Sequence, residues 1–278
     1  MNLFQRSVAA TALACGLVAT PGLSSTALAA APEALRSRCP THYLDGRLPR
    51  IANRKLGAAT AELCYGVFGV MHSGVTRTPL WSAEHLTAGQ VAAAGDLSRE
   101  DSFHAEQRLP PGVRAELDDY ARSGYDRGHM APNGDMPDRR TQHESFTLAN
   151  MVPQDADNNR HLWAGIEAVV RKQARKEGDL YVITGPAFIG RELQKIGNVL
   201  VPTHLYKLVY SPRQRAGAAF FVENRADAQY QVLGVAELES RIGIDLLPSL
   251  SAQRKQELLR LPNVRQRKGK ERSRQWAN

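Results

Sequence analysis

Cysteine is scarce in this chain. Its 278 residues include three, Cys15, Cys39 and Cys64, and none of them lies near the polar motif described below, so thiol catalysis is not expected. Nor does any His/Cys spacing match the ligand patterns of structural zinc sites.

Long apolar runs are also lacking. The run from Val8 to Val18 is too short for a permanent membrane anchor. It follows Arg6 and leads to the small residues Ala27-Leu28-Ala29, an Ala-x-Ala cleavage pattern. We therefore expect a signal peptide over residues 1–29, cut after Ala29, and an exported, periplasmic or extracellular protein without stable membrane association.

The predicted signal peptide determines which cysteines the mature protein contains. Cys15 leaves with the signal peptide, and Cys39 and Cys64 remain as a single pair. In an oxidising compartment such a pair is expected to form a disulfide bond, which would stabilise the fold by about 3 kcal/mol. Two free thiols are the alternative.

Acidic residues are outnumbered. There are 28 Asp and Glu against 36 Lys and Arg, which gives a net charge of +8, or 8 − 1 = +7 once Arg6 is removed. A basic protein favours polyanionic partners such as nucleic acid, although solubility alone also explains the charge.

Internal repeats and a mid-chain linker are absent from the sequence, which indicates one mixed α/β domain. We divide the chain into an N-terminal lead (30–59), a main domain (60–253) and a basic tail (254–278). Strands are predicted for Leu63–Met71 and Thr78–Ala83, which would form a hairpin, and for Leu180–Thr184, Val199–Tyr210 and Ala216–Val222.

A long helix is predicted over residues 155–177. Its apolar positions recur at helical spacing. Asp155 or Asp157 can cap its start, cations crowd its last turns, and Gly178 ends it. The apolar positions are Leu162, Ile166, Val169, Val170 and Ala174.

The segment Asp126–Pro132 is the most informative part of the sequence. We interpret it as a basic turn in which Gly128 allows the side chains of Arg127 and His129 to converge. Histidine can act as a general base near neutral pH, and arginine is a permanently charged donor to phosphate. Taken alone, His129 could equally be structural, and Arg127 could pair with Asp126.

The long helix supplies a second polar set. Asn159 and Glu167 are eight residues apart, which places them about 80° apart around a regular helix. Together they could address a hydrated hard cation such as Mg²⁺. The alternatives are that Asn159 is ordinary helix-start polarity and that Glu167 pairs with Arg171.

These residues carry a family resemblance. The segments Asp126–Pro132, Asn150–Gln154 and Asn158–Glu167 resemble the Asp-Arg-Gly-His signature and the following Asn…Trp…Glu helix of the DNA/RNA non-specific endonucleases. The resemblance covers roughly residues 60–250. It implies an α+β, ββα-metal nuclease fold, with a central, mostly antiparallel sheet, flanking helices and the catalytic helix at about 155–177.

The resemblance also implies roles. His129 resembles the general base, Asn159 the direct Mg²⁺ ligand, and Glu167 the carboxylate that orients a metal-bound water; Mn²⁺ or another divalent cation could replace Mg²⁺. Arg127 resembles the arginine beside the scissile phosphate and Asn150 a supporting active-site asparagine. Arg77 is aligned, more loosely, with a second phosphate-contacting arginine.

The implied activity is Mg²⁺-dependent hydrolysis of phosphodiester bonds in DNA and RNA to 5′-phosphate products. A phosphodiesterase on a small or non-nucleic substrate and a catalytically silent basic nucleic-acid-binding protein are the alternatives. A homodimer stays open, and so does a protein inhibitor, although nothing in the sequence indicates one.

Overall fold

The computed structural model describes residues 35–264. The predicted signal peptide (1–29), Cys15 and the tail beyond Val264 lie outside these residues. Within 35–264, no helix combines the length and the apolar character that crossing a lipid bilayer requires.

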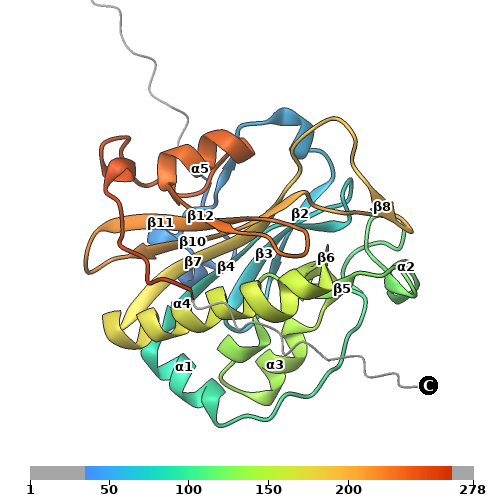
Figure 1. Ribbon diagram of the computed structural model, residues 1–278, viewed down its shortest axis with the longest axis horizontal. Helices are drawn as coiled ribbons and strands as arrows, with labels where there is room; N and C mark the ends of the chain where they lie inside the picture. Colours follow the sequence, from blue (N-terminus) through green and yellow to red (C-terminus); the bar gives the residue numbers. More distant parts are fainter. Residues whose placement is uncertain (1–34, 265–278) are drawn as a thin grey trace, which may run out of the picture. The chain divides into compact units, whose positions relative to one another are not determined.

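A seven-stranded antiparallel sheet forms the centre of the fold, in the order β12-β11-β10-β7-β4-β3-β2 (Figure 1). Its strands are β2 (Thr60–Cys64), β3 (Phe68–Ser73), β4 (Thr78–Thr87), β7 (Asp179–Ala187), β10 (His204–Ser211), β11 (Ala216–Glu223) and β12 (Tyr230–Gly234). Three two-stranded pairs complete the strands: β1 (Arg50–Ile51) with β13 (Ile244–Asp245), β5 (Asp126–His129) with β6 (Met151–Gln154), and β8 (Lys195–Ile196) with β9 (Val199–Leu200).

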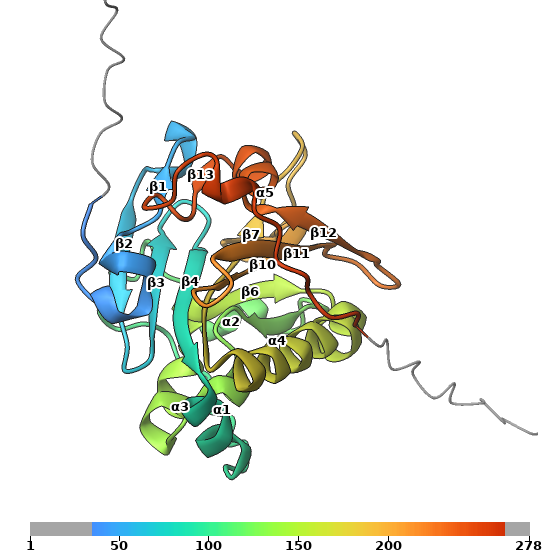
Figure 2. The same cartoon turned by 90° about the vertical axis from the view of Figure 1, so that its left-hand side faces the viewer.

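Helices cover the sheet on both faces (Figures 1 and 2). The long helix α4 (Ala164–Glu177) and α1 (Ala88–Gly95) lie on one face, and α5 (Val235–Ile242) lies on the other. Two short helices, α2 (Leu117–Tyr120) and α3 (Arg139–Ser145), flank the β5–β6 pair. The predicted α+β fold with a central antiparallel sheet is confirmed.

Strand alternation explains why both faces are apolar. Leu180 and Val182 of β7 pack with Ile166 and Val170 of α4, whereas the intervening Ile183 packs on the opposite side with residues of α5. Because successive strand residues point to opposite faces, a sheet covered on both sides buries nearly every position. The β7 and β10 strands are accordingly buried at nearly every position.

The predicted helix is present with the expected ends. The Asp155 carboxylate accepts a 2.9 Å hydrogen bond from the backbone N–H of Asn158, and Gly178 ends α4 with φ of 97°. One feature was not predicted: residues Asn158–Trp163 form a π-helical segment at the start of the helix. Such segments widen the helix locally and are frequent at functional sites.

Other predictions needed correction. The segment Leu63–Met71 is not one strand, because the chain reverses between β2 and β3; its partner β4 is present as predicted. The lead, the main domain and the tail, as divided from the sequence, contact one another. β1, in the predicted lead, pairs with β13, and Lys255, in the predicted tail, contacts Glu239 at 2.8 Å.

The predicted disulfide is present. Cys39 and Cys64 are bonded and join the segment before β1 to the end of β2. Tyr43 in the same segment is buried in the core. The bridge therefore fixes the N-terminal segment onto the sheet, away from the polar residues described next.

Candidate active site

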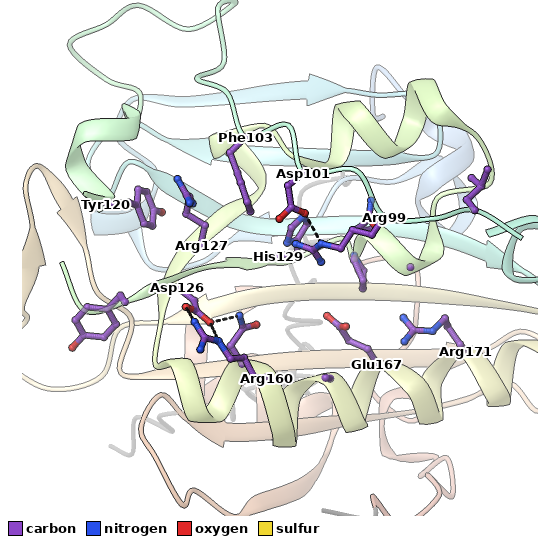
Figure 3. Close-up of a pocket in the computed structure, with 17 residues that line it drawn as sticks. Arg99, Asp101, Phe103, Tyr120, Asp126, Arg127, His129, Arg160, Glu167 and Arg171 are labelled. Atoms are coloured by element: carbon purple, nitrogen blue, oxygen red, sulfur yellow. Dashed lines mark hydrogen bonds and ion pairs between the residues drawn. The ribbon is translucent and has the colours of Figure 1, made fainter. Parts of the chain in front are cut away.

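One cavity of about 710 Å³ opens between the β5–β6 pair, the helix and the loop that follows α1 (Figure 3). Four arginines and three acidic residues line it together with His129 and Asn159. The arginines are Arg99, Arg127, Arg160 and Arg171, and the acids are Asp101, Asp126 and Glu167. The structure thus brings together four of the predicted site residues: Arg127, His129, Asn159 and Glu167.

The Asp-Arg-Gly-His motif is a strand rather than the predicted turn. Asp126–His129 forms β5 and pairs with β6, so that Gly128 lies opposite Val152. The glycine is needed for close approach: a Cβ at this position would lie 2.0 Å from Oε1 of Gln154. Gly128 therefore lets the two strands and the Gln154 side chain pack closely beneath the site.

His129 is buried at the cavity wall. Its ring makes an edge contact with Phe146 at 4.9 Å and a tilted contact with Phe103 at 5.8 Å. Nε2 is buried and has no hydrogen-bond partner among the described residues. Burial, reinforced by nearby Arg99, lowers the pKa of His129 to about 3. The imidazole is therefore neutral at physiological pH, as a general base must be.

The guanidinium of Arg127 is available to bind an anion. Its guanidinium lies 4.2 Å from the ring centroid of Phe103, an arrangement that holds the group by cation–π attraction. Within residues 35–264 it makes no ion pair or hydrogen bond. The other cavity arginines differ, since Arg160 is paired with Asp126 and Arg171 with Asp135. The alternative in which Arg127 pairs with Asp126 is therefore wrong.

The carboxylate of Asp126 holds Asn159 instead. Its Oδ2 accepts hydrogen bonds from Nδ2 of Asn159 at 3.0 Å and from Nε of Arg160 at 2.8 Å (Figure 3). The pKa of Asp126 is lowered: burial would raise it, but the hydrogen bonds from Arg160 and Asn159 outweigh that effect. With Nδ2 so engaged, Oδ1 is the atom that Asn159 has left to offer a ligand.

The π-helical segment brings Asn159 and Glu167 to one cavity. The backbone N–H of Ala164 bonds to the carbonyl of Asn159, five residues back. A wider turn rotates each residue by less than 100°, so the offset of about 80° expected for a regular helix is reduced. Both side chains line the cavity as a result.

Glu167 is not the ion-pair partner of Arg171. Arg171 instead donates to Asp135 at 2.9 Å, and Glu167 has no hydrogen bond or ion pair among the described residues. Burial raises the pKa of Glu167, an effect that the nearby charges of Arg171 and Lys207 oppose. A half-buried carboxylate without a partner among the described residues is suited to bind a cation or its water.

These donors fit a divalent metal. The amide oxygen of Asn159 and the carboxylate of Glu167 are hard oxygen ligands on one side of the cavity. Neither is committed to another protein group. Mg²⁺ keeps several waters and needs few protein ligands. A sparse oxygen site of this kind matches that preference, and no cysteine lines the cavity.

Asn150, predicted as a supporting active-site asparagine, lies beneath the cavity and not in its lining. It is fully buried and does not line the cavity. Its Oδ1 accepts from Ser82 Oγ at 2.7 Å and from the backbone N–H of Ala131 at 2.9 Å. Its Nδ2 donates to the carbonyls of Ala131 and Ser145. Asn150 therefore holds the backbone at Ala131, two residues after His129, through hydrogen bonds in the protein interior.

Arg77 is placed away from the site. It lies between β3 and β4 with a φ of 56°, and its guanidinium donates to the carbonyl of Gly112 at 2.8 Å. It is not among the cavity residues. The looser alignment that gave it a phosphate role is therefore not supported by its position.

Three arginines of the cavity, Arg99, Arg160 and Arg171, were given no site role by the sequence interpretation. Arg171 follows Glu167 by one helical turn and could have been found by extending the helix face that carries Asn159 and Glu167. Arg99 comes from the loop after α1, where it pairs with Asp101 at 2.5 Å and lies over the Phe146 ring. No periodic pattern marks that loop.

Comparison with known proteins agrees with this geometry. Residues 50–253 match the model of the DNA/RNA non-specific endonuclease family. The chain is 38% identical over 168 residues to nuclease C1 of Cunninghamella echinulata var. echinulata, covering 54% of this chain and 66% of the relative. It is 32% identical over 234 residues to the mitochondrial nuclease EXOG of Homo sapiens, covering 74% and 63%.

A solved structure is similar as well. The chain matches EndoG of an EndoG/EndoGI complex with a TM-score of 0.64 and 27% identity, over 69% of this chain and 88% of that chain. The predicted ββα-metal nuclease fold is thereby confirmed. The chain spans slightly less than two thirds of the length of the curated relatives described above.

Proposed function

Since this chain belongs to the DNA/RNA non-specific endonuclease family, we propose that it is an exported, Mg²⁺-dependent endonuclease that hydrolyses phosphodiester bonds in DNA and RNA to 5′-phosphate products. The observation that carries the proposal is the convergence of His129, Arg127, Asn159 and Glu167 on one cavity.

The base is His129. Its neutral imidazole has an unpartnered Nε2, which can take a proton from the attacking water. The rings of Phe103 and Phe146 limit how far the imidazole can rotate. His129 therefore fixes the position of the attacking water relative to phosphorus.

Arg127 binds the phosphate. Because its donors are not engaged by protein carboxylates, non-bridging phosphate oxygens do not have to displace an internal partner. Phosphate contacts carry no sequence information, so binding through Arg127 and its neighbours agrees with low sequence specificity.

Asn159 and Glu167 would hold the cation, Asn159 through Oδ1 and Glu167 through the water around the ion. When bound, the cation would neutralise the charge that develops on the phosphate and on the departing oxygen. Asp126 keeps the Asn159 amide in the orientation that this role requires.

The test is cleavage of plasmid DNA and of RNA with Mg²⁺ or EDTA, by wild type and His129→Ala. We expect cleavage of both polymers by wild type with Mg²⁺, a loss of at least 10²-fold in the variant, and none in EDTA. Undiminished cleavage by His129→Ala would overturn the assignment. Cleavage of a chromogenic diester without nucleic-acid cleavage would favour the small-substrate alternative, and tight DNA binding without cleavage the silent one.

Export and partners rest on other observations. Export depends on residues 1–29; sequencing the N-terminus of the mature protein should give Ala30 as the first residue. The EndoG that this chain resembles was solved as an EndoG/EndoGI complex that addresses EndoG inhibition. A protein inhibitor is therefore a candidate partner here, and a homodimer is the other.

A further inference from the structure

A second pocket adjoins the active-site cavity. It has a volume of about 270 Å³, and Tyr125 lines both it and the cavity. Tyr125 directly precedes Asp126 and Arg127 on the chain. We call this space the flanking pocket; Glu192, Gln194, His204, Glu223, Asn224 and Arg225 also line it.

The charge of the flanking pocket is opposite to that of the cavity. The cavity has four arginines against three acids. The flanking pocket has two acids, Glu192 and Glu223, and one cation, Arg225, whose guanidinium is paired with Glu223. Burial lowers the pKa of His204, so this side chain adds no charge at neutral pH. A second phosphate would be repelled here, whereas a neutral group with hydrogen-bonding edges would not.

Flat rings form part of its wall. The imidazole of His204 stacks on Phe221 with ring centroids 4.9 Å apart and an interplanar angle of 18°. Phe221 is buried in the core, so the imidazole is held in a fixed plane. The Tyr125 hydroxyl donates to Oε1 of Gln194 at 3.1 Å, which restrains the second ring. Nucleobases stack on such rings with little regard to sequence.

The floor of the flanking pocket is rigid and connected to the catalytic helix. Asn224 donates to the carbonyls of Pro153 and Pro202 and accepts from the backbone N–H of Asp155, which starts the helix. Asn158 donates to the carbonyl of Glu223 at 2.9 Å. The pocket is thus fixed relative to Asn159, the next residue, and has its shape before any ligand arrives.

We propose that the flanking pocket is a nucleobase subsite, which receives the base of a nucleotide adjacent to the scissile phosphate of a single-stranded segment. The base stacks against the rings of His204 and Tyr125, while its phosphate lies at Arg127 in the cavity. This inference rests on the proposed nuclease function and adds to it a binding site for the base itself.

The experiment uses intact protein with Mg²⁺ and a single-stranded oligodeoxynucleotide of mixed sequence that carries one abasic residue. Cleavage at every bond is measured from the product ladder and divided by cleavage at the same bond in the unmodified strand. Wild type should show cleavage reduced about tenfold at one bond, at a constant offset from the abasic residue wherever that residue is placed. Such a factor lies within the range measured for base stacking on aromatic side chains.

The variants His204→Ala and Tyr125→Ala should reduce that suppression to less than about threefold, because the pocket no longer discriminates a base from its absence. His161→Ala is the matched control, since His161 is half-exposed, pairs with Asp157 and lines neither space; it should keep the wild-type pattern.

Two outcomes overturn the inference: a wild-type ladder without a constant offset, or the full suppression retained in His204→Ala. If wild type cuts neither the modified nor the unmodified strand, it is the proposed nuclease function that fails. The normalised ladder also separates a lost subsite from a general loss of activity, since the latter lowers every bond equally.

Discussion

Nδ2 of Asn159 donates a 3.0 Å hydrogen bond to Oδ2 of Asp126, the first residue of the Asp-Arg-Gly-His motif. This contact connects the strand β5 to the helix that carries Asn159 and Glu167. It also decides which atom of the Asn159 amide faces the cavity. Asp126 is therefore a positioning residue for the proposed metal site, one step removed from the ion.

Asp126→Ala should weaken metal binding by about 10- to 100-fold, as loss of an outer partner of a metal ligand commonly does. The physical reason is that the freed Asn159 amide can rotate Oδ1 away from the ion. Mn²⁺ binding to the protein without nucleic acid, measured by calorimetry, reports this directly. Cleavage at saturating metal should recover much of the lost activity.

The control is Asp157→Ala, which removes an equal charge from the same end of the helix. Asp157 pairs with His161 at the surface and does not touch Asn159. Its metal affinity should stay within about threefold of wild type, because exposed charges contribute little. Equal losses of metal affinity in the two variants would mean that the negative charge of Asp126, and not its hydrogen bond to Asn159, determines metal binding.

The second prediction concerns pH. With a pKa of about 3, His129 stays neutral down to mildly acidic pH. We therefore expect kcat/KM to show no loss attributable to His129 between pH 8 and 5, whereas an unperturbed histidine would give a decline near 6.5. A pH profile on single-stranded DNA at saturating Mg²⁺ measures this. A decline centred near 6.5 that is attributable to His129 would contradict its buried environment.

The same burial links His129 to stability. Its folded-state pKa is depressed, so on acidification the unfolded chain binds this proton first. The stability contribution is complete above about pH 6.5 and is lost as the pH falls toward 3. When the pH is lowered from 7 to 5, the free energy of unfolding of wild type should fall by roughly 2 kcal/mol more than that of His129→Gln. Urea denaturation at both pH values measures the difference. His42, His72 and His204 have lowered pKa values too, but they are present in both proteins.

The sequence predicted the parts of the site that depend on local order. Asp155, Gly178 and the apolar stripe of the helix follow from capping and periodicity, which act over a few residues. The motif residues Arg127 and His129 were likewise identified from their sequence context. These are the features that short-range rules can determine.

What the sequence did not predict depends on contacts between distant segments. Arg77 and Arg99 are both arginines in polar surroundings, and only the path of the chain decides that Arg99 lies over the Phe146 ring at the cavity. Gly128 was assigned to a tight turn that would let the side chains of Arg127 and His129 converge. Its actual function, space for Gln154, requires knowledge that β5 pairs with β6.

Gly128→Ala gives the fourth prediction. The new Cβ would lie 2.0 Å from Oε1 and 2.7 Å from Cβ of Gln154, so the side chain and strand must move. Overpacking of this kind costs about 1–3 kcal/mol, and it displaces the neighbours Arg127 and His129. The midpoint temperature of thermal unfolding and kcat should therefore both be lower than in wild type.

Gly112→Ala is its control. A Cβ at Gly112 meets no atom within 4 Å, and its φ lies outside the left-handed region. Its stability should change by less than about 0.5 kcal/mol, with activity unchanged. If Gly128→Ala behaves like Gly112→Ala, the close approach of the two strands is not needed for the site.

Substitution of Asn150 tests whether this residue supports the site structurally or contacts the substrate. It makes four buried hydrogen bonds at 2.7–2.9 Å, two of them to Ala131, the second residue after His129. Asn150→Ala should lower the unfolding free energy by more than about 2 kcal/mol, because several buried partners lose their bonds. kcat should fall as the His129 segment loosens, while KM changes by less than about threefold.

Ser82→Ala provides the graded comparison. It removes one of the four hydrogen bonds, so it should cost about 1 kcal/mol and reduce kcat less than Asn150→Ala does. A substrate-contacting asparagine would show the reverse pattern, with stability unchanged and KM increased. Because Asn150 lies outside the cavity and beneath the backbone of Ala131, stability and kcat should fall together in proportion to the number of bonds removed.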